Sequence, residues 1–146
     1  MKSNPMQTLV ELAQVHESNA LKRLASRLAQ CRSEEEKFLL LQGYRNDYCV
    51  RFSNARQAGM NVPAISNFMQ FMNQLEAALG QQKRQVDLSQ RQIEDERDAW
   101  QQSRRRLQGF ESLLKRRQAS DRLVEARRAQ SGEDEFAARS RQSGCK

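Results

Sequence analysis

The sequence of 146 residues predicts an all-α fold, a long antiparallel two-helix coiled-coil hairpin. Three observations predict this fold. Apolar residues recur at a strict seven-residue spacing along the second half, the chain has only two prolines, and one cluster of helix-breaking residues divides it. A seven-residue repeat is close to two helical turns, so it marks a seam that packs on a partner helix. The seam residues are Ile65, Met72, Leu79, Val86, Ile93, Trp100, Leu107 and Leu114.

Breaker residues set the expected boundaries of the two helices. Pro5 suits the first turn of a helix, Gly59 a helix end, and Pro63 the start of the next helix. The expected segments are a lead-in over 1–5, a first helix over 6–57, a turn over 58–63, a second helix over 64–130 and a polar tail over 131–146. We expect residues 6–130 to form a single coiled-coil domain.

The short turn predicts which residues of the two helices meet. Two long helices joined by a few residues form an antiparallel hairpin, so the first helix can supply the partner seam. Counting outward from the turn places Phe68 near Phe52. The same count pairs Ile93 with Leu28, and Trp100 with Leu21.

The predicted seam is uneven along the second helix. A second apolar residue is expected three positions after each member of the stripe. Apolar residues occupy this position at Phe68, Leu75 and Phe110. Polar residues occupy it at Gln82, Ser89, Glu96 and Ser103. This pattern predicts a marginal, bendable middle of the hairpin, with ordinary irregularity as the alternative.

Nothing in the sequence predicts a catalytic site, a cofactor site or a metal site. The single histidine, His16, has no cysteine or histidine at a metal-ligand spacing, and no glycine-rich phosphate loop occurs. The three cysteines, Cys31, Cys49 and Cys145, are expected to be reduced thiols. No apolar run approaches the roughly 20 residues of a membrane span, and no signal peptide is apparent. We therefore expect a non-enzymatic cytoplasmic protein.

Two surfaces exceed what a seam between two helices requires. Near the turn, Phe38-Leu39-Leu40-Leu41 precedes Tyr44 and Tyr48, and the second helix carries a matching apolar surplus from Phe68 to Ala78. Such a patch is typical of a protein docking site, and the alternative is a bend or third segment that covers it.

The second surface is basic. Nine Lys or Arg residues and three acidic residues lie between Arg104 and Arg128, and the basic clusters recur about every 11 residues. Nucleic acid and an acidic protein groove are both possible partners of this surface. The alternative is that it is an ordinary solvent-exposed helix face without a partner. Apart from two aromatic residues that the heptad spacing assigns to the seam, this surface has no aromatic residue on which bases could stack. We therefore expect no nucleic acid as the main partner.

The chain resembles the flagellar export protein FliJ family along nearly its whole length. The resemblance rests on Tyr44-x-x-x-Tyr48, on Phe68 to Leu75, on Trp100 followed by Arg105-Arg106-Leu107-Gln108, and on Asp134-Glu135-Phe136-Ala137. It implies a coiled-coil component of flagellar type III export, similar to the central stalk of rotary ATPases. Such a protein promotes assembly and activity of the export ATPase hexamer, docks on the cytoplasmic domain of the export gate, and cycles export chaperones. Its place would be the cytoplasmic side of the flagellar basal body, at the inner membrane.

The resemblance also implies site residues. The residues that match the gate-docking face are Leu41, Tyr44, Tyr48, Phe71, Leu75 and Ala78. Lys37 and Gln82 depart from the family pattern, with glutamine and histidine the familiar residues there. For the ATPase, the resemblance implies only the end that carries both termini, including the basic stretch. The arginines assigned to it are Arg104, Arg105, Arg116, Arg117, Arg127 and Arg128. The alternatives from other classes are a basic coiled-coil nucleic-acid binder and a homo-oligomeric structural coiled coil.

Overall fold

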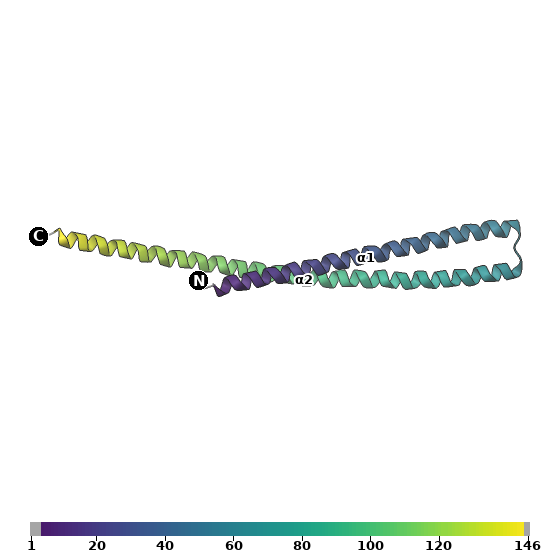
Figure 1. The fold of residues 1–146 in the computed structure, drawn as a ribbon, viewed down its shortest axis with the longest axis horizontal. Helices are drawn as coiled ribbons and strands as arrows, with labels where there is room; N and C mark the ends of the chain where they lie inside the picture. Colours follow the sequence, from purple (N-terminus) through teal and green to yellow (C-terminus); the bar gives the residue numbers. More distant parts are fainter. Residues whose placement is uncertain (1–3, 145–146) are drawn as a thin grey trace. The chain divides into compact units, whose positions relative to one another are not determined.

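A computed structural model describes residues 4–144, which form two helices, α1 (Pro5–Ala58) and α2 (Val62–Ser143) (Figure 1). The described residues contain no strand, and the two helices pack against each other, so the all-α hairpin prediction is confirmed. No helix in this range is both long enough and apolar enough to cross a membrane.

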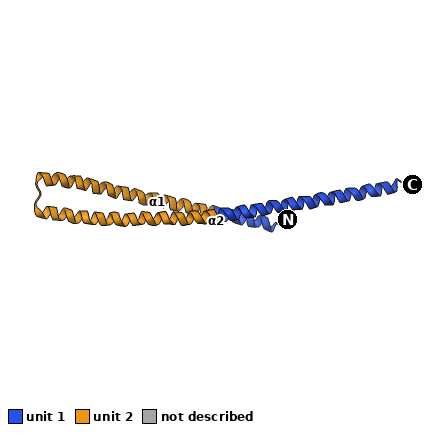
Figure 2. Ribbon diagram, turned by 180° about the vertical axis from the view of Figure 1, so that it is seen from behind, with its two compact units in different colours: residues 1–17, 102–146 blue, residues 18–101 orange. Residues whose placement is uncertain are grey.

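Contacts divide the chain into two compact units, and each unit contains part of α1 and part of α2 (Figure 2). Unit 1 comprises residues 1–17 and 102–146, and unit 2 comprises residues 18–101. In unit 2 the two helices run antiparallel and the turn joins them. A single coiled-coil domain over 6–130 stays a prediction.

Asparagine side chains cap the start of both helices. Asn4 Oδ1 accepts a hydrogen bond of 3.0 Å from the Met6 N–H, and Asn61 Oδ1 accepts one of 3.0 Å from the Ala64 N–H. Each bond satisfies a backbone donor that has no partner within the helix. Gly59 ends α1 with a φ of 97°, which an L side chain rarely adopts. The turn is therefore confined to residues 59–61.

The structure differs from the sequence-based expectation at the end of α2. The helix continues to Ser143, whereas the sequence predicted an end near Gln130 and a polar tail from 131. Gly132 adopts no positive φ, and a helix-interior glycine costs only about 1 kcal/mol relative to alanine. The surrounding Ala, Glu, Gln and Arg residues favour helix strongly enough to offset that cost. Cys145 lies outside the described residues.

The predicted stripe of α2 faces the other helix along its whole length. All eight stripe residues are buried or half-buried, and Leu79 is only 5% exposed. The positions three residues later, from Phe68 to Phe110, are also buried or half-buried, including the polar ones. The seam is therefore continuous through the middle of the hairpin, where polar residues occupy part of it.

The seam of α1 follows the same repeat, which the sequence revealed only in part. Apart from Gln42, its buried and half-buried residues alternate spacings of three and four. They are Met6, Val10, Ala13, Glu17, Ala20, Leu24, Arg27, Cys31, Glu34, Phe38, Leu41, Arg45, Tyr48, Phe52 and Ala55. Four of these positions hold charged residues, which hides the pattern from an apolar count.

The expected partner residues of α1 are correct near the turn and shifted farther away. Phe52 stacks on Phe68 with ring centroids 4.0 Å apart, as predicted. Leu21 and Leu28, which were expected in the seam, are 45% and 43% exposed. Leu24, which lies between them, is buried. The heptad phase of α1 thus differs from the one that the leucines suggested.

Candidate interaction surfaces

The predicted docking face near the turn is a mixture of exposed and supporting residues, all in unit 2. Tyr44 and Phe71 are the exposed members, at 50% and 40%. Tyr48 lies half-buried between the helices, with its ring centroid 4.5 Å from that of Phe71. Leu75 is buried, so it supports the face from beneath and offers a partner little surface. The remaining members, Leu41 and Ala78, are half-buried.

Contacts across the hairpin hold this face in place. Tyr48 also approaches Phe68 of α2, at 6.3 Å between centroids, and within α1 the Arg51 guanidinium lies 5.9 Å from the Tyr48 ring centroid. Arg45 Nη1 lies 3.5 Å from Glu76 Oε1, which links α1 to α2 beside the aromatic residues. Aromatic side chains ordered before binding lose little entropy on docking, which favours a binding role.

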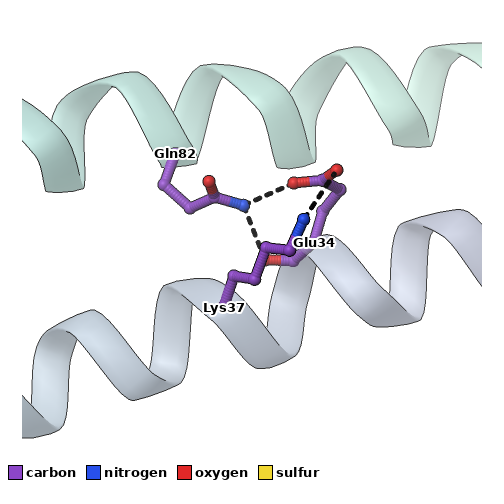
Figure 3. A network of polar contacts seen from close by, with 3 residues as sticks. All are labelled: Glu34, Lys37 and Gln82. Atoms are coloured by element: carbon purple, nitrogen blue, oxygen red, sulfur yellow. Dashed lines mark hydrogen bonds and ion pairs between the residues drawn. The ribbon is translucent and has the colours of Figure 1, made fainter.

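Lys37 and Gln82, which the resemblance marked as departures, meet in one polar network with Glu34 (Figure 3). Gln82 Nε2 donates hydrogen bonds to Glu34 Oε2 at 2.6 Å and to the Glu34 backbone carbonyl at 3.0 Å. Lys37 Nζ lies 3.9 Å from Glu34 Oε1. The amide of Gln82 is directed across the seam toward α1. It therefore contributes to holding the helices together at the edge of the docking face.

Further polar layers follow along the seam of unit 2. Arg27 Nη1 donates to Gln92 Oε1 at 3.1 Å, and Arg23 Nε donates to Glu96 Oε2 at 3.3 Å. Ser89 is 4% exposed. Among the described residues, no buried side-chain nitrogen or oxygen lacks a hydrogen-bond partner. The sequence reasoning missed these layers because it treated polar heptad positions as gaps. Reading charged residues at spacings of three and four would have found them.

The basic stretch, residues 104–128, lies in unit 1 on α2. All six arginines predicted to meet the ATPase are exposed, and every described residue from 115 onward is exposed as well. The seam ends at Leu114, because the next two heptad positions are Asp121 and Arg128. From that point α2 presents its whole circumference to solvent.

Chemical reactivity is limited in the described part of the chain. No group of three or more His, Cys, Asp or Glu residues there could hold a metal ion. Cys31 is buried in the seam, and burial raises the pKa of its thiol, assisted by the hydrogen bond that Sγ donates to Glu35 Oε1 at 3.5 Å. A thiol with a raised pKa is a poor nucleophile at neutral pH. Cys49 is exposed.

An open hollow of about 330 Å³ lies beside the seam of unit 2. Its walls are formed by Glu35, Phe38, Leu39, Lys83, Val86 and Asp87. The hollow is open to solvent, and its walls include neither histidine nor cysteine.

These features define a class of protein: a coiled-coil hairpin with long exposed helical faces. The comparisons identify the family. The family model described as "Flagellar FliJ protein" matches residues 1–144. The Flagellar FliJ protein of Escherichia coli (strain K12) is 29% identical over 132 residues, which cover 90% of both chains. That of Salmonella typhi is 28% identical over 134 residues, covering 92% of this chain and 91% of the relative. The chain belongs to the flagellar FliJ protein family, which places it in flagellum biogenesis and export.

Proposed function

We propose that this chain is a non-enzymatic coupling protein of flagellar type III export. In this proposal it promotes assembly and activity of the export ATPase hexamer, docks on the cytoplasmic domain of the export gate, and cycles export chaperones. It acts on the cytoplasmic side of the flagellar basal body, at the inner membrane. The observation that carries the proposal is the family match along residues 1–144, which includes both surfaces described above.

The gate-docking site is assigned to the face near the turn. Tyr44 and Phe71 are large and exposed, and the Phe71 ring packs against Tyr48. Aromatic residues of this kind supply a large share of the binding energy at protein interfaces. Leu75 and Tyr48 support them from within the seam.

The ATPase site is assigned to the basic stretch of unit 1. Here α2 is exposed on every side beyond Leu114, so a ring of subunits can surround it. The two assigned surfaces share no residue, which is what coupling of two partners requires.

Mixing the chain with the purified export ATPase tests the ATPase role. We expect a larger hexamer fraction by mass photometry and faster ATP turnover than without the chain. A variant with Arg116→Gln and Arg117→Gln should stimulate less than a control with Arg84→Gln and Arg91→Gln, which removes equal charge from unit 2. An unchanged hexamer fraction together with unchanged turnover would contradict the proposed role.

A second experiment tests the gate-docking site. Tyr44→Ala combined with Phe71→Ala should weaken binding to the gate's cytoplasmic domain at least about 30-fold, because the loss of even one such residue costs about 2 kcal/mol or more. Val50→Ala combined with Leu88→Ala is a matched control, since these residues are 60% and 47% exposed and lie outside the proposed site. Titration calorimetry gives the affinities and circular dichroism gives the helicity. Equal affinities of the two variants would refute the site.

A further inference from the structure

Three exposed leucines of unit 1 lie on one flank of its seam. On α1, Leu9 and Leu12 each immediately precede a buried seam residue. On α2, Leu113 immediately precedes the half-buried Leu114. In an antiparallel pair of helices, the residues that precede seam positions lie on the same flank of both helices. We call these three residues, which are 41%, 52% and 46% exposed, the leucine patch.

The leucine patch lies beside one layer of the seam. Phe52 stacks on Phe68, and the same number of heptads outward along each helix leads to Val10 and Phe110. Gly109 immediately precedes Phe110, and a Cβ added there would meet nothing within 4 Å. The surface beside the leucines is therefore open to a side chain of a partner.

The two flanks of the seam differ in charge in this part of unit 1. Arg106 lies about two turns before Leu113 and Arg116 lies about one turn after it, so both arginines border the leucine patch. No acidic residue precedes a seam position in residues 5–17 or 102–116. The opposite flank, where residues follow seam positions, carries two basic and two acidic residues: Arg104, Lys115, Glu11 and Glu111. Of the two flanks, only that of the leucine patch has unbalanced positive charge.

We propose that the leucine patch, together with Arg106 and Arg116, binds an acidic amphipathic segment of the export ATPase. This inference rests on the proposed function and adds to it the chemistry of the partner segment and a contact on α1. Apolar residues of the segment cover the leucines and exclude water, and its carboxylates pair with the arginines at the rim. An apolar centre with a charged rim is the usual composition of a specific protein interface.

The leucines and the arginines make separable contributions to this binding. Removing the exposed part of each leucine from water lowers the dissociation constant severalfold. The arginines accelerate association and fix the orientation of the segment. Salt screens exposed charges but does not weaken apolar contacts, so ionic strength distinguishes the two contributions.

Other partners fit the leucine patch less well. A bilayer surface takes up an apolar line along a helix, whereas the patch occupies only about one turn of each helix. Nucleic acid would account for the arginines, but the leucines have no counterpart on its phosphate backbone. The patch contains no aromatic residue on which a base could stack.

The affinity of the full chain for the purified export ATPase, measured by biolayer interferometry at stepped salt concentrations, tests this inference. The leucine variant replaces the whole patch, with Leu9→Ser, Leu12→Ser and Leu113→Ser. Its control replaces three leucines of unit 2 that are 45%, 43% and 47% exposed, with Leu21→Ser, Leu28→Ser and Leu88→Ser. The arginine variant combines Arg106→Gln with Arg116→Gln, and its control combines Arg84→Gln with Arg91→Gln. Circular dichroism verifies the helicity of every variant.

The leucine variant should bind at least about tenfold more weakly at every salt concentration, since each leucine contributes severalfold. Its control should bind within about twofold of the wild type, because it lies outside the contact. The arginine variant should lose affinity mainly at low salt, so its affinity should depend less on salt than that of its control. ATP turnover by the ATPase should fall in the same order.

A blocking variant separates the inference from loss of folding. Gly109→Gln adds a helix-favouring residue whose side chain occupies the open space beside the leucines, so the helix should remain at least as stable. This variant should nevertheless bind the ATPase severalfold more weakly. Gly80→Gln, the corresponding change in unit 2, should leave the affinity unchanged.

The outcomes distinguish this inference from the proposed function. A wild-type chain that neither binds the ATPase nor raises its turnover would refute both. If the wild type binds, equal losses by the leucine variant and its control, or no effect of Gly109→Gln, would overturn the inference alone. An arginine variant with the same salt dependence as its control would rule out an acidic partner segment. Flotation on anionic vesicles that only the leucine variant loses, with ATPase binding retained, would make a bilayer the occupant.

Discussion

Replacing Gln82 with alanine should lower the free energy of unfolding by about 1.5 kcal/mol. The Gln82 amide donates to the Glu34 carboxylate at 2.6 Å and to its backbone carbonyl at 3.0 Å, across the two helices. Both bonds disappear in the variant, and the Glu34 carboxylate loses its partner from α2.

The size of the effect follows from the surroundings of Glu34. A hydrogen bond to a charged group contributes about 1.5–3 kcal/mol. The Glu34 side chain is 17% exposed and Lys37 Nζ remains 3.9 Å away, so water and the lysine replace part of the lost interaction. The lower end of the range therefore applies. For a chain of 146 residues it corresponds to a fall in Tm of about 3–6 °C.

A double-mutant cycle isolates this interaction. Urea unfolding followed by circular dichroism gives the stability of the wild type, Gln82→Ala, Glu34→Ala and the double variant. The coupling energy between the two sites should be about 1 kcal/mol. Gln81→Ala serves as the matched control, because Gln81 is the exposed neighbour of Gln82 and its loss should cost less than about 0.5 kcal/mol. A coupling energy within about 0.3 kcal/mol of zero, or an equal loss in Gln81→Ala, would refute the reasoning.

The remaining predictions concern the turn, the core and the thiols. Gly59→Ala should lower the free energy of unfolding by about 1 kcal/mol, because Gly59 has a φ of 97°. Gly80→Ala should raise it by about 0.5–1 kcal/mol in the same urea assay, because the space around the added Cβ is open. Effects of the opposite sign would disprove the assignment of Gly59 as the helix cap. Leu79→Ala should lower the free energy of unfolding by about 2 kcal/mol. This value is at the low end for a core leucine, because water can enter a core formed by only two helices. An unchanged stability would count against the assignment of Leu79 to the seam. At pH 8, Cys49 should react with a thiol reagent much faster than Cys31, and similar rates would contradict the burial of Cys31. The pKa of the Cys31 thiol is raised in the folded protein, so the thiol contributes its full stabilisation below the ordinary thiol pKa of 9.0 and loses it as the pH rises through the folded value. The urea midpoint of the wild type should therefore fall more steeply with pH than that of Cys31→Ala. Parallel pH profiles of the two proteins would contradict the shift.

The α2 stripe shows what the sequence could establish about the fold. Apolar residues at an uninterrupted seven-residue spacing predict a buried stripe, because no competing pattern explains that spacing. The α1 seam could not be found in the same way. Arg27 and Glu34 occupy seam positions while Leu21 and Leu28 lie outside it, so hydrophobicity alone misplaces this part of the seam. Only the partner residues Gln92 and Gln82 on α2 make those polar positions acceptable.

The docking face shows the corresponding limit for function. Surplus apolar residues near the turn indicated a surface, but sequence spacing could not separate exposed from supporting residues. Leu75 is buried and Phe71 is exposed, although both belong to the same predicted set. That difference depends on how the two helices are rotated about their axes, which the polar layers help to fix. The helix beyond Gln130 was missed because one glycine was given more weight than the helix formers around it.

Retention of the gate domain on the ATPase tests the coupling role most directly. The export ATPase is immobilised, and the gate's cytoplasmic domain is passed over it with and without this chain, while surface plasmon resonance records the bound mass. The account predicts that the gate domain is retained only when the chain is present. It also predicts that retention is lost with Tyr44→Ala and Phe71→Ala, although the chain itself still binds. Retention of the gate domain without the chain, or a chain that binds either partner but never both, would contradict the account.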